Sequence, residues 1–334
     1  MLLHDDVIAE YRDFATYAAG DSPCFEAWAS AVAEDPEVLA WLGTLPPVKR
    51  QPNLVLAAAR WHGAPAPGPY AGLRRVLLEQ EAEVRATVMT RSTQTNEVGR
   101  LASLVPVMAL VEGPLALVEV GASAGLCLYP DRYDYAWPPA GDLRGSGGPL
   151  LTALASGPLP VPAAHPAVAW RGGVDLNPLD VADPDAMAWL ENLVWPEQDE
   201  RRERLRAAIE VTHAEPPVLR TGDLLDHLPD LLAEAADHGT PVVLHSAVVA
   251  YLEPADRQRW HDLMTGLVSE GRCRWISNEA PTVLPGVTGS LAVPPGRFVT
   301  ALDGVPVAVS HGHGHAVDWV GRGGGESCRW GPAH

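Results

Sequence analysis

The sequence predicts an α/β protein in which a helical amino-terminal region precedes a doubly wound, mostly parallel sheet. Two observations support this prediction. Strand-like runs are nearly absent before Leu115, where apolar residues recur at helical spacing instead. From Leu115 onward, short apolar runs alternate with helix-like segments, an order that is typical of parallel strands joined by helical crossovers. We therefore expect a helical region over residues 1–100 and an α/β core over residues 101–334.

The first hundred residues are expected to form helices joined by Pro-rich turns. The run from Asp5 to Ala19 places apolar side chains three or four residues apart, with acids suited to its start and Gly20 suited to its end. A Pro- and Gly-rich loop is expected over residues 63–72. The helical pattern continues over four further segments: Cys24–Ala33, Pro36–Leu42, Leu54–His62 and Gly72–Thr90.

Five short apolar runs are the expected strands of the core, and four helix-like segments lie between them. The strands are Leu115–Val120, Ala167–Val174, Pro217–Arg220, Pro241–His245 and Arg274–Ser277. The helices are Asp183–Leu193, Glu197–Thr212, Leu224–Ala236 and Pro254–Ser269. The tail predicts two strands around a turn at an antiparallel edge, Phe298–Val309 and His315–Val320. The Gly- and Pro-rich stretch Gly141–Pro166 predicts an insertion or a mobile loop.

The charge balance of the chain limits its partners. The 334 residues include 24 basic and 42 acidic ones, which gives a formal net charge of −18. Nucleic acids and anionic membranes attract clustered Lys and Arg, so this balance argues against either as the main partner. A small-molecule substrate is the expectation that remains, and the sequence leaves the oligomeric state open.

We expect a cytoplasmic protein. The start, Met1 to Ala15, is acidic and amphipathic, whereas a secretory signal needs a basic start and an apolar block. The most apolar stretch, Leu101 to Leu128, is interrupted by Glu112, Gly113, Pro114 and Glu119, so no membrane-spanning helix is expected. Four cysteines lie far apart, without the paired spacing of a disulfide framework or a cysteine-rich zinc site: Cys24, Cys127, Cys273 and Cys328.

The most informative motif is LALVEVGASAGL, from Leu115 to Leu126. An apolar strand ends at an acid, Glu119. The chain then turns through Gly121, Ser123 and Gly125 into an expected helix, whose first N–H groups would be unpaired. Three interpretations stay open at this point. The turn binds a nucleotide-type ligand, or it is a nucleophile elbow of the form G-x-S-x-G, or it is a structural turn without a ligand.

Acids also follow the next two expected strands. Asp175 ends the second strand, and Asp223 follows the third. In open parallel sheets, ligands bind outside the carboxyl ends of the strands, where a carboxylate can accept both hydroxyls of a ribose. Asp223 would then lie within reach of an adenine amino group. The alternative is that both aspartates only cap the helices that follow them.

Two other enzyme classes fit the turn less well. A serine hydrolase with Ser123 as nucleophile normally has several strands before its elbow, but the residues upstream of Leu115 look helical. A dinucleotide dehydrogenase needs G-x-G-x-x-G, whereas the glycine spacing here is G-x-x-x-G. No basic partner for a phosphate stands nearby. The site is therefore expected to suit a ligand with little negative charge, such as a sulfonium nucleoside.

At these residues the sequence resembles class I S-adenosylmethionine-dependent methyltransferases. Their first motif, acid-x-Gly-x-Gly-x-Gly, is similar to residues Glu119–Gly125, except that Ser123 replaces the middle glycine. More specifically, the chain resembles an uncharacterised bacterial domain-of-unknown-function family with such a core. Seven segments carry that resemblance: TQTNEVGR (Thr93–Arg100), VEVGASAGLCLYPDRYDY (Val118–Tyr135), GVDLNPLDV (Gly173–Val181), LVWPEQ (Leu193–Gln198), GDLLDHLP (Gly222–Pro229), HSAVVAYL (His245–Leu252) and WISNEAP (Trp275–Pro281).

The resemblance implies a Rossmann-like fold with an S-adenosylmethionine pocket. Independently of it, we expect no metal site. The residues implied for the methionine end are Glu119, Gly121, Ser123 and Gly125. Those implied for the ribose and the adenine are Asp175 with Leu176 and Asp223 with Leu224. Arg100 is a further binding candidate, because a guanidinium can clamp a carboxylate of the donor or of an acidic substrate; the alternative is a surface pair with Glu97. We expect Asn96 and Arg100 to share one face of a helix.

Catalytic candidates follow the fourth and fifth expected strands. His245 is a candidate general base, because the unperturbed pKa of histidine suits proton transfer near neutrality, although a lone histidine at a strand end is more often structural. Tyr251 and Glu279 follow on the same edge. In a methyl transfer, much of the catalysis can come from holding donor and acceptor at attack distance.

Two further clusters allow more than one interpretation. The aromatic residues from Tyr129 to Trp137 could face a sulfonium through cation–π contacts, but core packing is the expected role of most of them. His311, His313 and His315 could face one side of a strand and bind zinc, yet the intervening glycines favour a loop.

The sequence thus predicts an S-adenosylmethionine-binding enzyme that methylates a small molecule. Two alternatives stay open. S-adenosylmethionine could itself cyclise or eliminate without methyl transfer, because no unambiguous base and acceptor constellation is visible. The chain could also be a non-catalytic ligand-binding protein that keeps only the pocket.

Overall fold

The computed structural model describes residues 6–321 and divides the chain into two compact units. The helical unit comprises the residues up to Asn96 together with residues 182–206, and the α/β unit comprises residues 97–181 and the residues from 207 onward. The boundary after Asn96 therefore lies close to the expected boundary at residue 100. The segment 182–206, expected in the core, belongs to the helical unit instead.

Short helices with aromatic contacts build the helical unit. Their bounds are α1 (Val7–Ala18), α2 (Pro23–Val32), α3 (Pro36–Leu42), the 3-10 helix η1 (Pro47–Lys49), α4 (Pro52–Trp61), α5 (Tyr70–Glu79), α6 (Glu81–Thr90) and α8 (Pro184–Asn192). Asp6 caps α1 by accepting the Ile8 amide at 2.9 Å, as its position in the sequence predicts. Trp195 from the later segment packs edge-on against Phe14, with ring centroids 5.7 Å apart, which explains why residues 182–206 join this core.

The α/β unit contains a nine-stranded sheet of mixed orientation with a parallel centre. Its strands, in spatial order, are β5 (Leu154–Ser156), β12 (Ala316–Trp319), β11 (Val305–His311), β10 (Arg297–Leu302), β9 (Arg274–Glu279), β8 (Thr240–Ser246), β1 (Leu115–Val120), β6 (Val168–Asp175) and β7 (Val218–Thr221). The five strands from β9 to β7 are parallel to one another. These are the five strands that the sequence predicts, each within two residues of the expected bounds.

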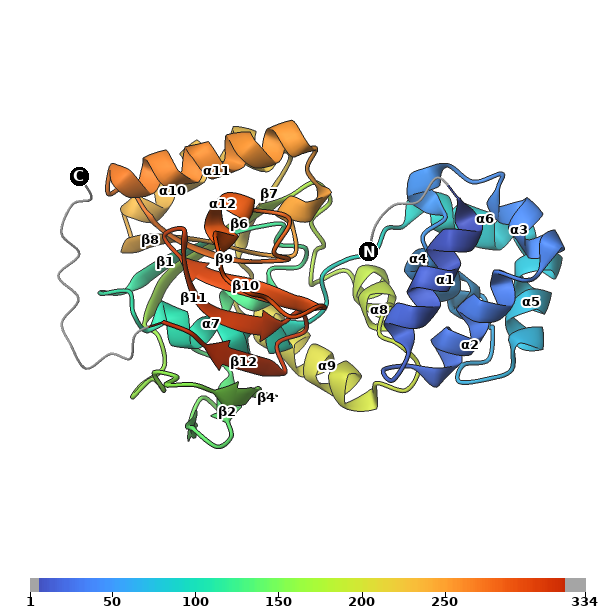
Figure 1. The fold of residues 1–334 in the computed structure, drawn as a ribbon, viewed down its shortest axis with the longest axis horizontal. Coiled ribbons are helices and arrows are strands. Elements are labelled where there is room, and N and C mark those ends of the chain that lie inside the picture. Colours follow the sequence, from blue (N-terminus) through green and yellow to red (C-terminus); the bar gives the residue numbers. More distant parts are fainter. Residues whose placement is uncertain (1–5, 322–334) are drawn as a thin grey trace. The chain divides into compact units, whose positions relative to one another are not determined.

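Helices cover the faces of this sheet. The strand-to-strand crossovers contain α9 (Asp199–Ala214), α10 (Leu224–Ala236), α11 (Pro254–Ser269) and the short α12 (Pro285–Thr288). Figure 1 shows α10 and α11 running along one side of the sheet, where their apolar residues share a core with Val118 and Val120 of β1. Side chains alternate along a strand, so Glu119 points to the opposite face. Helix α7 (Leu101–Met108) packs on β9 and β10.

An insertion separates β1 from β6. It carries a three-stranded sheet in the order β3 (Gly141–Leu143), β2 (Asp134–Trp137) and β4 (Leu150–Thr152), and it also carries β5, which joins the main sheet. The stretch Gly141–Pro166 is therefore an insertion, as predicted, but it contains short strands.

The tail differs from the prediction of two strands. The run Phe298–Val309 is not one strand, because a tight turn at Asp303 and Gly304 divides it into β10 and β11. Both turn residues have positive φ, 53° and 78°, a backbone that an Asp-Gly pair adopts readily in two-residue hairpins. Strand β10 pairs antiparallel with β9, so the predicted antiparallel edge is present with one strand more.

Candidate functional site

The strand order of the α/β unit reverses at β1. The chain runs from β1 to β6 on one side, and it later returns to β8 on the other side of β1. In open parallel sheets, ligands bind at such a reversal, in the crevice outside the carboxyl ends of the strands. The residues that follow β1, β6 and β8 therefore define the candidate site.

The turn after β1 depends on positive φ angles. Gly121, Ser123 and Gly125 have φ of 70°, 53° and 72°. No side chain fits at Gly121, because a Cβ there would lie 2.4 Å from a methyl group of Val248. The Gly121 amide donates to the carbonyl oxygen of Val174 at 2.8 Å, which ties the turn to the end of β6. The glycine motif thus brings the loop after β8 onto the turn after β1.

The prediction of a helix after this turn is wrong. Between the turn and β2, the described chain forms only the three-residue 3-10 helix η3 (Leu126–Leu128). Pro130 explains the early end, because it lacks an N–H group and disfavours helical backbone at the preceding Tyr129. The turn therefore presents backbone amides without the dipole of a full helix.

Glu119 is a buried carboxyl group at the centre of the site. Its side chain is 5% exposed, and Oε2 has no hydrogen-bond partner among residues 6–321. Burial raises the pKa of Glu119 well above its usual value; nearby Arg100 lowers it and Asp175 raises it. An uncompensated buried oxygen costs free energy, so this atom is suited to accept a proton or a donor group from a ligand.

Arg100 comes from a different local structure than expected. Arg100 ends the 3-10 helix η2 (Val98–Arg100) and Asn96 lies outside any helix, so the prediction that Asn96 and Arg100 share a helical face is wrong. Glu97 caps η2 by accepting the Gly99 amide at 2.8 Å, so η2 begins after Glu97 and does not include Asn96. The Arg100 guanidinium donates from Nη1 to the carbonyl oxygen of Ser246 at 2.8 Å, while its buried Nε has no partner in the described chain.

Asp175 is held in place by backbone amides. Its Oδ2 accepts from the Ser123 amide and its Oδ1 from the Asn177 amide, both at 2.8 Å. Each carboxylate oxygen has a second acceptor position, so both can also receive hydrogen bonds from a ligand. The neighbouring Leu176 is 76% exposed, which is unusual for a leucine and gives the strand end an apolar surface.

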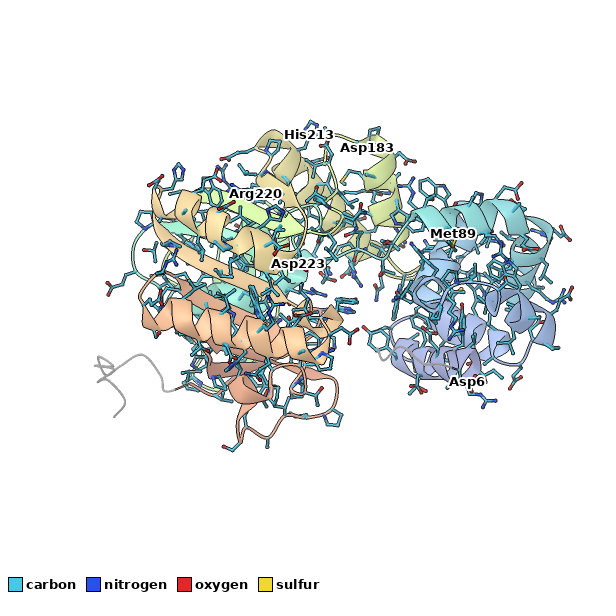
Figure 2. All side chains as sticks on the ribbon, turned by 90° about the horizontal axis from the view of Figure 1, so that it is seen from above. Asp6, Met89, Asp183, His213, Arg220 and Asp223 are labelled. Carbon is cyan, nitrogen blue, oxygen red and sulfur yellow. The ribbon has the colours of Figure 1, made fainter. Side chains whose placement is uncertain are left out.

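Asp223 and Leu224 have structural contacts. Asp223 is exposed and accepts the Leu225 amide at 2.8 Å as the N-cap of α10, the alternative that its sequence position allowed. It stands at the start of α10, where Figure 2 labels it. Leu224 is 9% exposed and packs in the core beneath α10. Both residues lie at the carboxyl edge of β7, the strand next to β6.

His245 is buried, and neighbours engage both of its ring nitrogens. The indole N–H groups of Trp275 and Trp260 lie 3.0 and 3.3 Å from Nε2, which therefore acts as an acceptor. The ring proton then sits on Nδ1 and is donated to Oε1 of Glu279 at 2.8 Å. This arrangement leaves His245 no nitrogen that could take a proton from a substrate. It is the arrangement of a structural hydrogen-bonding residue.

Glu279 fixes the loop that follows β8. Its Oε1 also accepts the amides of Val248 and Val249 at 3.0 and 3.1 Å, and Val248 is the residue that packs on Gly121. Its buried Oε2 has no partner within residues 6–321. The same loop ends in the 3-10 helix η4 (Val249–Tyr251), where the Tyr251 side chain is 80% exposed. Tyr251 is thus a solvent-facing phenol at the edge of the site.

Backbone strain gathers at the same two loops. Ser123 follows β1, and Ala247, with φ of 57°, follows β8. Residues with a side chain rarely adopt such angles, and strain of this kind is concentrated at functional sites in proteins. Ser123 is 1% exposed, and its Oγ has no partner in the described chain, so no described histidine activates it as a hydrolase nucleophile.

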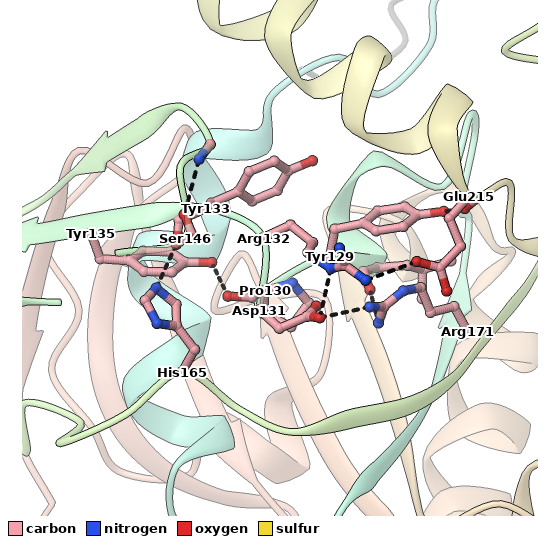
Figure 3. Close-up of polar contacts among 12 residues, drawn as sticks. Tyr129, Pro130, Asp131, Arg132, Tyr133, Tyr135, Ser146, His165, Arg171 and Glu215 are labelled. Carbon is pink, nitrogen blue, oxygen red and sulfur yellow. Dashed lines mark hydrogen bonds and ion pairs between the residues drawn. The ribbon is translucent and has the colours of Figure 1, made fainter. Parts of the chain in front are cut away.

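The aromatic run packs in the core. Tyr129, Tyr133, Tyr135 and Trp137 are fully buried. Their polar atoms bond to backbone carbonyls, as Trp137 does to Ala102 at 2.6 Å. The cation over the Tyr129 ring is the buried Arg171 of β6, 4.7 Å from the ring centroid. Figure 3 shows this contact region, in which Arg171 also reaches Asp131 at 2.7 Å. These rings are therefore used within the protein, and a sulfonium contact finds no support in them.

Three other features complete the comparison with the sequence. His311 and His315 stack with centroids 3.6 Å apart, and among residues 6–321 no group of three His, Cys, Asp or Glu side chains is arranged to hold a metal ion. Cys24, Cys127 and Cys273 are free and buried, and Cys328 lies outside the described residues. Within the described part, no helix combines the length and apolarity needed to cross a membrane.

Sequence reasoning missed a buried polar network in the middle of the sheet. Oδ1 of Asn278 accepts from the hydroxyls of Ser310 and Thr300 at 2.8 and 3.1 Å, and its amide nitrogen donates to Ser246 Oγ at 2.9 Å. Thr300 and Ser310 were not singled out, although a polar residue inside an apolar strand run is a usable signal.

The fold and site thus define a mixed α/β protein with polar side chains gathered at the reversal point of a largely parallel sheet. A family model described as an uncharacterized protein conserved in bacteria (DUF2332) matches residues 9–319. The chain belongs to this family, which is the resemblance that its seven segments indicate. No curated protein and no solved structure gave a match.

Proposed function

We propose that this protein binds S-adenosylmethionine at the carboxyl edge of β1, β6 and β8 and transfers the methyl group to a small molecule. One observation carries the proposal. Glu119 Oε2 and Ser123 Oγ are buried without partners in the described chain, next to the fixed carboxylate of Asp175. An unpaired buried polar atom costs about 1–3 kcal/mol, which a bound donor group removes. The ammonium group of a methionine moiety is such a donor.

The residues at this edge of the sheet match the parts of this ligand. Asp175 keeps one acceptor position on each oxygen for the two ribose hydroxyls. The exposed Leu176 offers an apolar surface to the adenine, and Asp223 stands at the next strand end. Arg100 supplies N–H groups for the carboxylate of the methionine moiety. The acids Glu119 and Asp175 favour a ligand that carries positive charge.

S-adenosylmethionine supplies an electrophilic methyl group, so the protein has to hold donor and acceptor in line and exclude water. His245 has no free nitrogen for proton transfer, and we assign it, with Glu279, to positioning the loop after β8. Tyr251 is the exposed group of that loop that can contact an acceptor. An acceptor that is already nucleophilic would need no base.

Calorimetric titration with S-adenosylmethionine, S-adenosylhomocysteine and NAD tests the binding. We expect the two adenosyl ligands to bind and NAD not to bind. Asp175→Ala should weaken adenosyl binding by at least about tenfold, because hydrogen bonds to a charged group contribute roughly 1.5–3 kcal/mol. Asp226→Ala, which removes an exposed acid from α10, is the matched control and should leave affinity unchanged. Equal affinities of the wild type and Asp175→Ala would reject the ribose assignment.

Product analysis separates the two other functions that the sequence allows. S-adenosylhomocysteine as the product of incubation with candidate acceptors means methyl transfer. Methylthioadenosine means that the donor itself has cyclised or eliminated. Binding without either product across an acceptor library indicates a ligand-binding protein without catalysis.

A further inference from the structure

A pocket that is separate from the candidate site lies at the carboxyl edge of β8 and β9. It is enclosed by the first turns of α11, which follows β8, and by residues Thr282–Gly286, which follow β9. Its volume is about 240 Å³. Arg257, Gln258 and His261 line the helical wall at positions that share one helix face, whereas Val283 and Leu284 contribute apolar surface opposite them. The pocket therefore joins a polar wall to an apolar one.

Arg257 brings a positive charge that no carboxylate in the described chain neutralises. Its Nε donates to the carbonyl oxygen of Leu252 at 2.9 Å, and its Nη2 donates to that of Ala250 at 2.7 Å. A guanidinium has five N–H groups, so three are left without a partner within residues 6–321. The two carbonyl bonds hold the group rigidly, which favours planar recognition of an oxyanion over a mobile surface charge.

The other two polar side chains of the helical wall already contact a residue of the protein. Gln258 donates to Asp262 at 2.7 Å, and His261 approaches the same carboxylate at 3.5 Å. The Asp262 side chain is 68% exposed, so solvent screens its charge. The His261 ring packs edge-on against Trp275, and a Cβ at Gly286 would lie 2.9 Å from its Nε2, so the ring is held at the wall. Arg257 is therefore the cation available to a ligand.

We propose that this pocket binds a small carboxylic acid. The carboxylate pairs with the free N–H groups of Arg257, and the apolar part of the molecule lies against Val283 and Leu284. Arg257 also holds the carbonyls on either side of Tyr251, so an occupant of the pocket contacts the group that supports this loop. The identification of this acid as the methyl acceptor rests on the proposed function. The binding of a carboxylic acid to the pocket does not rest on it.

Titration with benzoate, in the absence of any adenosyl ligand, tests the inference. Benzamide has nearly the same shape without the charge and is the control ligand. We expect saturable benzoate binding, weaker by about tenfold to a hundredfold in Arg257→Gln, because a charge-assisted pair is lost. Arg259→Gln removes a 69% exposed arginine from the same helix and should bind benzoate like the wild type.

Two further measurements keep the test decisive if Arg257→Gln perturbs the loop. Thr282→Trp fills the mouth of the pocket from an exposed position and should abolish benzoate binding. Benzamide should bind the wild type at least about tenfold more weakly than benzoate. No benzoate binding, equal binding of the two ligands, or equal benzoate affinity of Arg257→Gln and the wild type would each overturn the proposal. None of these results bears on adenosyl binding, which is measured separately.

Discussion

Two groups of polar side chains in the α/β unit differ in whether their buried polar atoms have hydrogen-bond partners. The crevice group consists of Arg100, Glu119 and Ser123, and each member has a buried polar atom without a partner in the described chain. The β9 network consists of two hydrogen-bonded clusters, each of which includes a side chain of β9: His245 with Trp260 and Trp275, and Asn278 with Thr300 and Ser310. The two groups meet where β1, which carries Glu119, pairs with β8, which carries His245.

The difference separates polar groups that stabilise the fold from polar groups that reduce its stability. A buried hydrogen bond contributes roughly 0.5–1.5 kcal/mol, whereas a buried group without a partner costs about 1–3 kcal/mol. The β9 network therefore contributes to the stability of the sheet. The unpartnered atoms of the crevice group reduce the stability of the fold, which is a cost that proteins accept mainly at functional sites.

The largest expected effect is that of His245→Phe on stability. The change leaves two buried indole N–H groups unpaired and takes a donor from Glu279, so the free energy of unfolding should fall by about 3–5 kcal/mol. Chemical denaturation measures this loss. His238→Phe alters an exposed histidine and should change stability by less than about 0.5 kcal/mol. Similar small losses for both variants would mean that His245 does not support the sheet.

Glu119→Gln should stabilise the protein, in contrast to a change in the β9 network. Burial raises the pKa of Glu119 above its usual 4.5. Below pH 4.5 the carboxyl is protonated in both the folded and the unfolded state, so charge burial costs nothing. As the pH rises toward the raised pKa, only the unfolded state loses the proton, and the folded state becomes less stable.

The uncharged amide that Glu119→Gln introduces removes that pH-dependent loss. We expect the variant to be more stable than the wild type at about pH 8, and we expect this difference to shrink as the pH falls toward about 4. Thermal unfolding across this range measures the difference, and Glu253→Gln, at an exposed position before α11, serves as the control. A stability gain that does not depend on pH would contradict a charge effect.

The strands and helices were predictable where one local signal marks each boundary. Helices α10 and α11 begin and end at the expected residues, since Asp223 caps the first and Pro254 opens the second. The helix after Gly125 was predicted wrongly because the apolar residues that follow fit a short 3-10 turn equally well. The division of the tail carried a signal, the pair Asp303-Gly304, which is typical of a tight hairpin.

The candidate site was predictable in its position but not in its contacts. Acids at strand ends indicate the carboxyl edge, because the edge follows from parallel order alone. Whether His245 has a free nitrogen depends on two tryptophans that lie 15 and 30 residues away in the sequence. The bond from Arg100 to Ser246 spans 146 residues. Such contacts follow from packing, and no local pattern encodes them.

The smallest effect comes from a matched pair of buried serines. Ser310 is fully buried, and its hydroxyl bonds to Asn278 and Thr300, so Ser310→Ala should lower the free energy of unfolding by about 1–2 kcal/mol. Ser123 is 1% exposed with an Oγ that has no partner in the described chain, so Ser123→Ala should change stability by less than about 0.5 kcal/mol or raise it slightly. Denaturation curves of both variants give the comparison.

The same pair tests whether the unpartnered hydroxyl awaits a ligand. If Ser123 Oγ contacts the methionine end of the ligand, Ser123→Ala should weaken S-adenosylmethionine binding by about fivefold, the value of one neutral hydrogen bond of roughly 1 kcal/mol. Ser310→Ala should bind normally once its folded fraction is taken into account. If instead Ser123→Ala lowered stability as much as Ser310→Ala and left binding intact, Ser123 would belong to the fold, and the distinction between the crevice group and the β9 network would fail at that residue.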